Sequence, residues 1–260
     1  MKRILLNISL SFLFSFFSFS LFSQDIHFSQ FYNSPLNLNP GLIGAFKGEF
    51  RLVANQRNQW SSVTTPYSTY GLSVDAKRIF NSPFGTGLAI YQDKAGDGEY
   101  STLQIALGGT YTIRLKDTTQ SVSFGVQPAF TQRSINYANL KFDNQYNGVQ
   151  YDANLGNGES FSNEGQTYVN LHGGIAWNYE IAQRKTLGAG IAVHNIIKPQ
   201  QSFFNENIPL HQRYTINVNG LFRISEKIDA LPNINWQKQH KFQEIIFGGQ
   251  GKYHLNNGNY

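Results

Sequence analysis

Six histidines are the side chains of this chain best suited to metal binding or proton transfer, and they are scattered along it. None has the His-Glu-x-x-His spacing that places two zinc ligands on one face of a helix. His172 and His194 share a parity on two predicted neighbouring strands, so their rings could approach each other. A zinc centre would need a third ligand, which the sequence does not identify, and two polar side chains on the inner face of a sheet are the simpler interpretation. The full set is His27, His172, His194, His211, His240 and His254.

A second group of candidate ligands is the carboxylates of "DKAGDGE", residues 93–99. Asp93, Asp97 and Glu99 could hold calcium, but the EF-hand order of ligands at positions 1, 3 and 5 is absent. The glycines between them favour a solvated loop. The chain has no Gly-x-Ser-x-Gly nucleophile motif and no cysteine. The sequence therefore predicts no enzyme, no cofactor and no metal site.

The first 23 residues have the pattern of an export signal. Lys2 and Arg3 precede an uncharged stretch, "ILLNISLSFLFSFFSFSLFS", which ends at Ser23. A basic start, an apolar centre and a small residue near the end predict a secretory signal peptide over 1–23, whose cleavage exposes Gln24. An uncleaved membrane anchor is the alternative, which the six serines of the stretch weaken.

The composition of the remaining chain is unusual for a soluble domain. Without Lys2 and Arg3, 19 Lys and Arg face 16 Asp and Glu, a net charge of +3, and no basic cluster indicates a nucleic-acid partner. Charged residues are 14% of the chain and aromatic residues 15%, with 24 glycines. Soluble domains usually carry about 25% charge. Low charge, many aromatic residues and an export signal together indicate a membrane β-barrel.

Strict alternation supports the barrel. Odd positions from Leu103 to Leu115 are apolar apart from one glycine, and the even positions are small or polar. A helix with its period of 3.6 residues could not use this pattern, whereas a barrel strand places one parity in lipid and the other inside. The pattern recurs at 122–131, 169–179, 187–194 and 215–224, and more weakly at 49–56, 67–78, 85–92, 231–238 and 244–253. The predicted fold class is all-β, an antiparallel transmembrane outer-membrane β-barrel over 47–260 with about ten strands visible.

A soluble β-sandwich also alternates, so the choice depends on other features. The predicted strands exceed the roughly 5–6 residues usual in globular proteins. Trp177 and Tyr179 lie at a strand end, where a membrane interface favours aromatic residues. Connections at 81–84, 116–120, 180–186 and 225–230 are short, while those at 57–66, 93–99, 134–166 and 195–212 are longer. Short periplasmic turns and long outer loops are typical of these barrels, so the first strand is expected to run outward from the periplasm.

The end of the sequence leaves closure of the barrel open. The last residues, "YHLNNGNY", read as a turn with no alternating strand after them. Either ten strands close the barrel or the chain is truncated at its C-terminus. An Asn/Gly-rich turn normally leads into another strand, which favours truncation.

Charged residues collect on the parity that faces the interior. Placing Arg or Lys in mid-membrane lipid costs about 2–4 kcal/mol, so this arrangement is enforced by the solvent. A basic interior could select anions or grip an inserted segment, and mutually paired polar filling is the simpler alternative. The interior charges are Arg51, Asp75, Lys77, Arg114, Arg213, Arg223, Glu244 and Lys252.

Two irregular segments are candidates for binding. The long connection at 134–166 includes Tyr146 and Tyr151 among many Asn and Gly, a composition that suits either a recognition surface or a lid. Residues 24–46 carry Pro35 and Pro40, which prevent regular ladder pairing, so this segment is expected to plug the barrel from below or to form a periplasmic docking face. Its expected aromatic anchors and backbone partners are Phe28, Phe31, Tyr32, Gln30, Asn33, Asn37 and Asn39.

The opening stretch "QDIHFSQFYNSPLNLNPGLIGAF", residues 24–46, resembles the N-terminal signature of the PorP/SprF family. Weaker similarities follow in the family's order: "RNQW" at 57–60, "GTGLAIYQDKAG" at 85–96, "SVSFGVQPAF" at 121–130 and "KFQEIIFGG" at 241–249. Members of that family usually run further, with more strands.

The resemblance implies a non-enzymatic outer-membrane protein of type IX secretion and gliding motility. It implies contact with periplasmic secretion-system proteins, including a peptidoglycan-binding partner, and with a secreted surface protein or adhesin. The leading hypothesis is therefore docking: outer loops hold a surface partner and the periplasmic face meets the machinery. The alternative is a porin-like channel that passes small solutes.

Overall fold

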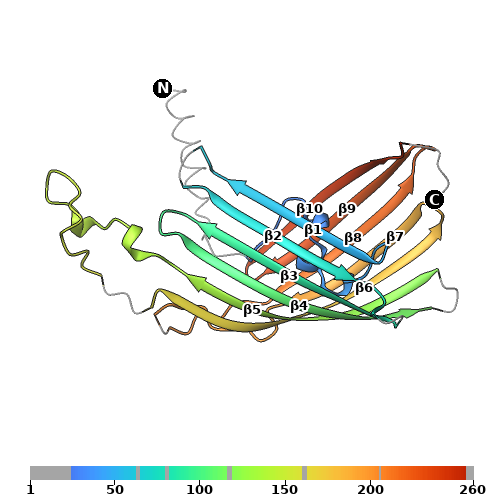
Figure 1. Ribbon diagram of the computed structural model, residues 1–260, viewed down its shortest axis with the longest axis horizontal. Helices are drawn as coiled ribbons and strands as arrows, with labels where there is room; N and C mark the ends of the chain where they lie inside the picture. The colour runs from blue at the N-terminus through green and yellow to red at the C-terminus, as the bar shows by residue number, and fades with distance from the viewer. Residues whose placement is uncertain are drawn as a thin grey trace, which may run out of the picture.

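Ten antiparallel strands form one sheet in chain order, which curls into a half-barrel (Figure 1). The computed structural model describes residues 25–62, 65–79, 82–115, 119–159, 163–204 and 206–255. The predicted signal peptide, 1–23, lies outside the described residues. The strands are β1 (Phe50–Gln59), β2 (Tyr67–Ala76), β3 (Phe84–Ala95), β4 (Tyr100–Arg114), β5 (Gln120–Ser134), β6 (Gly165–Ala182), β7 (Lys185–His194), β8 (Arg213–Arg223), β9 (Ile228–Gln239) and β10 (Phe242–Tyr253).

The all-β antiparallel fold and each of the ten predicted strands are confirmed. Several strands extend beyond the alternating stretch that predicted them, as in β6, which pairs with β5 from Gly165 to Tyr179 and with β7 as far as Ala182. Helical structure is limited to short turns: η1 (Phe31–Asn33), α2 (Pro35–Leu38), η2 (Pro40–Leu42), η4 (Tyr137–Asn139) and η5 (Asp143–Gln145). In the described part of the chain, no helix is both long and apolar enough to cross a membrane.

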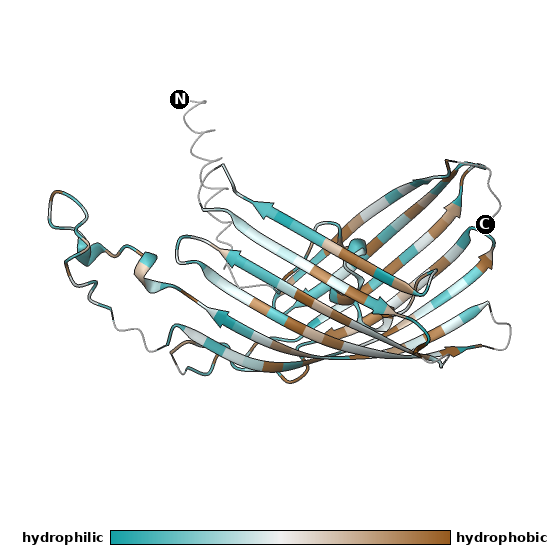
Figure 2. Cartoon of the chain, viewed as in Figure 1, coloured by the Kyte–Doolittle hydropathy of each residue, from teal (hydrophilic) through white to brown (hydrophobic). Residues whose placement is uncertain are grey.

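The two faces of the sheet have opposite chemistry. In β4, Leu107 on the convex face is 60% exposed, whereas its neighbour Ala106 on the concave face is 2% exposed. In β8, the apolar Ile216 is exposed while Thr215 and Asn217 are buried. Figure 2 shows hydrophobic and hydrophilic residues following one another in bands along the strands. A sheet that exposes aliphatic side chains and buries polar ones is suited to lipid outside and a polar interior.

The connections define two ends of the half-barrel. At the short-turn end lie the described residues of the connections 77–83, 115–119, 183–184 and 224–227; at the long-loop end lie those of 60–66, 96–99, 135–164, 195–212 and 240–241. The predicted long connection at 93–99 is wrong, since Asp93 and Lys94 belong to β3 and only 96–99 form a tight turn. Gly96 and Glu99 both adopt left-handed backbone conformations there, which closes the turn in four residues.

The sheet has two free edges, because no ladder joins β1 to β10 among the described residues. Of the two alternatives, a barrel closed by these ten strands is therefore not seen in the described residues. Residues of η1 lie between the edges: the Asn55 side chain of β1 donates to the Asn33 carbonyl at 2.9 Å, and Gln250 of β10 donates to the Asn33 side chain at 2.9 Å.

Candidate functional site

Residues 25–46 cross the concave face of the sheet from one end to the other (Figure 1). At the long-loop end, the Asn195 amide donates to the Asp25 carboxylate at 2.6 Å, and the Asp25 backbone N–H donates to Gln239 at 3.1 Å. At the short-turn end, the Gly44 N–H donates to Asp75 at 2.8 Å. The segment, predicted either to plug the barrel from below or to form a periplasmic docking face, thus follows the concave face from the long-loop end to the short-turn end. An irregular backbone without ladder partners finds them on the polar concave face.

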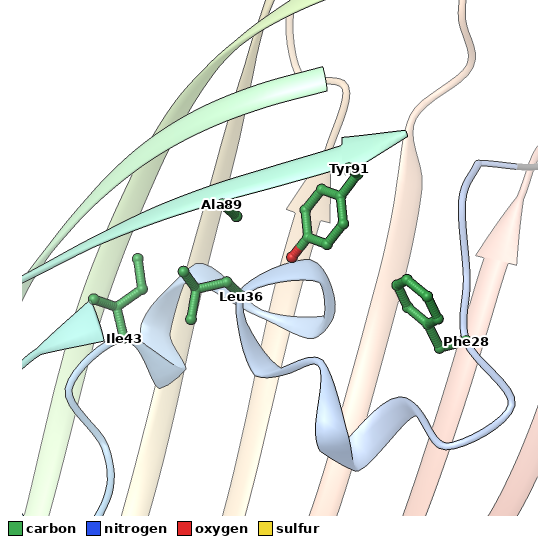
Figure 3. Close-up of a cluster of buried hydrophobic side chains, with 5 residues drawn as sticks. All are labelled: Phe28, Leu36, Ile43, Ala89 and Tyr91. Atoms are coloured by element: carbon green, nitrogen blue, oxygen red, sulfur yellow. The ribbon is translucent and has the colours of Figure 1, made fainter. Parts of the chain in front are cut away.

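Apolar side chains of this segment form the core of the molecule. Phe28, Leu36 and Ile43 pack with Ala89 and Tyr91 of β3, and all five are buried (Figure 3). The strands offer room for them at glycines. A Cβ added at Gly71 would lie 2.9 Å from the Phe28 ring, and one at Gly87 would lie 2.9 Å from Leu36. The sequence predicted Phe28 as an anchor and missed Leu36 and Ile43. The glycines on concave positions were the available signal.

Asn39 is the most deeply held residue of the segment, with 0% exposure. Its side-chain N–H groups donate to the Ile175 carbonyl at 3.1 Å and to the Asn217 side chain at 3.2 Å, and its side-chain oxygen accepts from the Gly41 N–H at 2.8 Å. The backbone here approaches β5 so closely that a Cβ on Gly125 would overlap the Pro40 carbonyl. One amide therefore joins the segment to strands β6 and β8.

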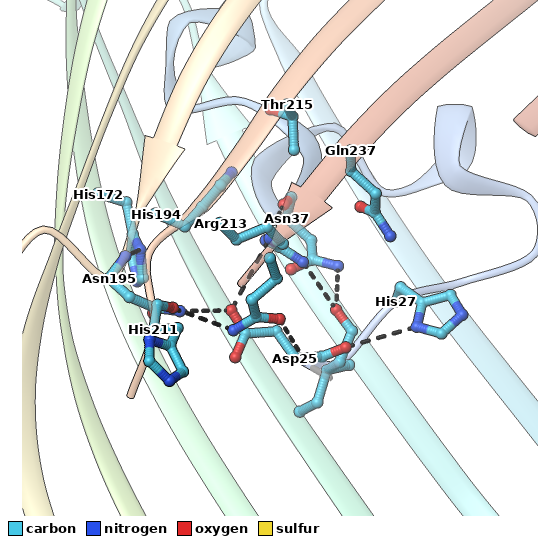
Figure 4. A network of polar contacts seen from close by, with 12 residues as sticks. Asp25, His27, Asn37, His172, His194, Asn195, His211, Arg213, Thr215 and Gln237 are labelled. Carbon is cyan, nitrogen blue, oxygen red and sulfur yellow. Dashed lines mark hydrogen bonds and ion pairs between the residues drawn. The ribbon is translucent and has the colours of Figure 1, made fainter. Parts of the chain in front are cut away.

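Arg213 holds the other part of the segment. Its guanidinium donates to the Ile26 carbonyl at 3.3 Å and to the Asn37 carbonyl at 3.0 Å, and it lies 3.8 Å from the Asp25 carboxylate (Figure 4). Nearby, His194 and Thr215 donate to the Leu38 carbonyl at 3.2 and 3.1 Å. Buried donors on the strands thus satisfy backbone carbonyls that no helix or ladder satisfies.

Two further arginines bind the segment near its ends. Arg51 forms a two-pronged ion pair with buried Asp75, at 2.9 and 2.7 Å, and donates to the Leu42 carbonyl at 3.0 Å. Arg57 donates to the His27 carbonyl at 2.7 Å. Both alternatives for the interior charges are seen here: Arg51 and Asp75 pair with each other across strands, and Arg51 and Arg213 also bind an inserted segment, which is the chain's own.

The remaining interior charges lie closer to the two ends of the half-barrel. Glu244 accepts a hydrogen bond from Gln237 near the long-loop end. Lys77 donates to the Phe46 carbonyl at 3.2 Å at the short-turn end. The three others lie exposed at the ends of β4, β8 and β10, at the short-turn end: Arg114, Arg223 and Lys252.

Most of the aromatic and amide candidates of the N-terminal segment point into the molecule. Phe28, Phe31 and Asn39 are buried, and the Asn37 side chain donates to the Ile26 carbonyl at 3.0 Å. Tyr32 packs against Gly248 of β10, and Asn33 bridges the two edge strands. Gln30 is exposed and accepts from the Asn33 side chain at 2.9 Å. In this position the segment offers little side-chain surface to a partner.

The long connection has the opposite arrangement. Tyr146 is 58% exposed and Tyr151 is 40% exposed, and the two residues form an isolated backbone bridge with each other. Lys141 lies over the Tyr151 ring at 5.1 Å. These two predicted partner contacts are therefore accessible.

The predicted histidine pair does come together. The rings of His172 and His194 are 5.1 Å apart, and His172 accepts from the Asn195 backbone N–H at 3.2 Å. Within the described ranges, no group of three or more His, Cys, Asp or Glu side chains is placed to hold a metal ion. Asp93 accepts instead from Thr69 at 2.5 Å, and Asp97 from Thr65. Each of these two carboxylates thus has its own hydroxyl partner.

A small polar cavity of about 70 Å³ remains between residues 25–37 and strands β3 to β8. It is lined by Gln127, Arg133, His172 and Arg213 among others. A site of this size holds a few water molecules, since one water needs roughly 10–15 Å³ of such space.

A family model described as "Type IX secretion system membrane protein PorP/SprF" matches residues 20–257. The chain belongs to this family. The match begins at the end of the predicted signal peptide and covers the interior segment and all ten strands, as the resemblance of residues 24–46 indicated. No curated protein sequence matches the chain. As a PorP/SprF member it is a membrane protein of the type IX secretion system.

Proposed function

We propose that this PorP/SprF protein is a non-enzymatic outer-membrane barrel that docks other proteins and conducts no solute. After removal of residues 1–23 as a signal peptide, residues 25–46 fill the interior as a plug. The short-turn end faces the periplasm and meets the secretion machinery. The long-loop end, with Tyr146 and Tyr151, holds a secreted surface protein, which supports its export and gliding motility.

The observation that carries this proposal is the anchoring of the plug at both ends and in the middle. Asp25 is bound at the long-loop end, Asn39 at the centre and Gly44 at the short-turn end. Each contact uses a buried side chain or carbonyl of a strand or of the residue that follows one, so removing the plug would leave those groups without partners. A plug fixed in this way favours a rigid scaffold over a gated pore.

The alternative, a solute channel, needs a continuous open path through the interior. The cavity beside the plug has a volume of about 70 Å³, which is room for a few water molecules. The strands also pack closely against the plug, since any residue larger than glycine at position 125 would overlap the Pro40 carbonyl. These features favour docking over conduction.

Two experiments separate the functions. Reconstituted in planar bilayers, the full chain is expected to be silent, whereas a variant lacking residues 25–46 is expected to conduct if its strands still insert. In the native cell, deletion of the gene is expected to abolish surface display of the secreted partner while solute uptake stays intact. Steady, solute-selective conductance of the full chain would support the channel and overturn the docking proposal.

A further inference from the structure

Cations gather at the short-turn end of the half-barrel. Among the described residues, three carboxylates, Glu49, Glu180 and Glu226, are exposed there. Glu180 is already used by Lys47, at 3.6 Å. Two other carboxylates at this end, Asp75 and Asp229, are buried and paired with Arg51 and Arg184. The exposed cations at the same end are more numerous: Lys47, Arg78, Arg114, Lys185, Arg223, Lys227 and Lys252.

The long-loop end lacks this excess. Its exposed carboxylates within the described ranges are Asp97, Glu99, Asp143, Glu159, Glu164 and Glu206. Its exposed cations there are Lys94, Lys141, Lys198, Lys238 and Lys241. The two signs nearly balance, so the excess of exposed positive charge among the described residues is concentrated at the short-turn end.

Several of the short-turn cations belong to the concave face. Arg114 has the parity of buried Ala106 and Thr110, and Arg223 has the parity of buried Thr215 and Asn217. Lys252 has the parity of Gly248, which contacts Tyr32 of the plug. Because side chains alternate strictly along a strand, these three point toward the mouth of the half-barrel and away from the convex, lipid-facing side.

The rim that carries these cations is held in place. The Arg184 guanidinium, in the turn between β6 and β7, pairs with Asp229 of β9 at 2.6 Å and donates to the Glu226 carbonyl at 2.7 Å. His254, just after β10, contacts Asp229 at 2.8 Å. Two turns and the end of β10 are thereby joined, so the cations near them are presented on a fixed scaffold.

We propose that Arg114, Arg223 and Lys252, termed the basic mouth, form a docking surface for an acidic face of a soluble protein. Opposite charges steer such a partner to the mouth and set its orientation. A lipid headgroup is the less suitable occupant, because headgroups surround the convex side while these side chains face inward. The inference rests on the proposed function, and it specifies which end of the barrel binds the partner and that the partner's contact surface is acidic.

The test uses the full chain in nanodiscs of zwitterionic phosphatidylcholine and a fluorescent poly-glutamate peptide of about ten residues, whose binding is followed by anisotropy. The variant R114E/R223E/K252E reverses three charges of the basic mouth. The matched control, K94E/K141E/K238E, makes the same change of charge at the long-loop end. Heat-modifiable gel migration establishes that each variant is folded.

The wild type and the control are expected to bind the peptide, and the basic-mouth variant to bind at least about tenfold more weakly. Binding by the wild type is expected to weaken between about 20 and 200 mM salt, since screening shortens the range of charge attraction. Equal loss in both variants, or unchanged binding by the basic-mouth variant, would overturn the proposal.

A lipid role gives a different result. Selective retention of phosphatidylglycerol over phosphatidylcholine by the wild type, lost in the basic-mouth variant and without peptide binding, would assign these cations to headgroups and overturn the inference. Neither result depends on bilayer conductance, so the docking surface and the non-conducting scaffold can fail separately.

Discussion

Residues 25–46 and residues 135–159 are both irregular, rich in aromatic and amide side chains, and yet they lie in opposite surroundings. The first segment is packed inside the sheet, with Leu36 and Ile43 each 1% exposed. The second lies outside the sheet at the long-loop end, with Tyr146 and Val149 exposed (Figure 1). Composition alone therefore does not decide whether an irregular segment fills an interior or forms a surface. The difference lies in the strands, which offer the first segment glycines and buried donors.

The largest effect is expected from blocking the space that the plug needs. A Cβ on Gly125 would overlap the Pro40 carbonyl, whereas one on Gly109 of the opposite face has its nearest neighbour at 3.9 Å. Gly125→Val should prevent the plug from seating, because backbone cannot yield as a flexible side chain does. Chymotrypsin should then cut within residues 25–46 of the variant and leave that segment intact in Gly109→Val. Equal protection of the two variants would contradict the close packing described here.

Aromatic truncation compares the two segments directly. Phe28→Ala removes a buried ring that packs against Tyr91, with 6.3 Å between ring centroids, and should cost about 3–5 kcal/mol of folding stability. Tyr146→Ala removes an exposed ring and should change stability by less than about 0.5 kcal/mol. Unfolding of the refolded protein in detergent, followed by gel migration against denaturant, measures both. Similar losses for the two variants would show that the long connection is also part of the packed structure.

Amide truncation gives a smaller contrast of the same kind. Asn39 makes hydrogen bonds to β6 and β8, so Asn39→Ala should destabilise the fold by about 2–3 kcal/mol, at roughly 1 kcal/mol for each bond lost. Asn147 caps only its own turn, accepting from the N–H groups of Val149 and Gln150. Asn147→Ala should cost about 0.5 kcal/mol or less because water replaces those bonds. The same unfolding assay applies, and a loss for Asn147→Ala matching that for Asn39→Ala would remove the distinction.

The smallest effect is expected from pH. Burial of His27 in the plug and the positive charge of Arg57 lower the pKa of its imidazole from the ordinary value of 6.5, with a partial offset from Glu244. The detached segment therefore takes up a proton more readily than the seated one, so seating should weaken as the pH falls through about 6.5 and be strongest above it. Chymotrypsin protection of residues 25–46 between about pH 7.5 and 5.5 measures this. In His27→Gln the pH dependence of this protection should be reduced. If the variant shows the same dependence as the wild type, another titrating group is responsible.

Alternation predicted the strands well because it is a local property. In β4, neighbouring residues lie on opposite faces of the sheet. The large apolar Leu107 marks the convex face and the small Ala106 marks the concave face. The connections were harder to predict. Asp93 and Lys94 are polar and appeared to belong to a loop, but both are paired in the ladder with β4, and a strand near an aqueous rim tolerates polar side chains.

The interior site was predicted only in part. Phe28 was predicted as an aromatic anchor and Asn39 as a partner of the bent backbone, and the interior parity of Arg51 and Arg213 was predicted from the alternation. The sequence could not predict which backbone carbonyls these arginines bind, because Arg213 and Asn37 are 176 positions apart in the chain. Leu36 and Ile43 were missed because their partners are glycines, whose absent side chains become informative only once the strands are side by side.

The amino-acid sequence by itself determined the period-two strands, the apolar and polar faces of the sheet, and the signature at 24–46 that belongs to the PorP/SprF family. Only the tertiary structure decided that this signature lies inside the sheet and that Arg114, Arg223 and Lys252 gather at one mouth. The physical reason is the separation along the sequence between the residues that interact. A face of a strand is set by neighbouring residues, whereas the room for Pro40 beside Gly125 and the partners of Asn39 on β6 and β8 come from strands distant in the chain.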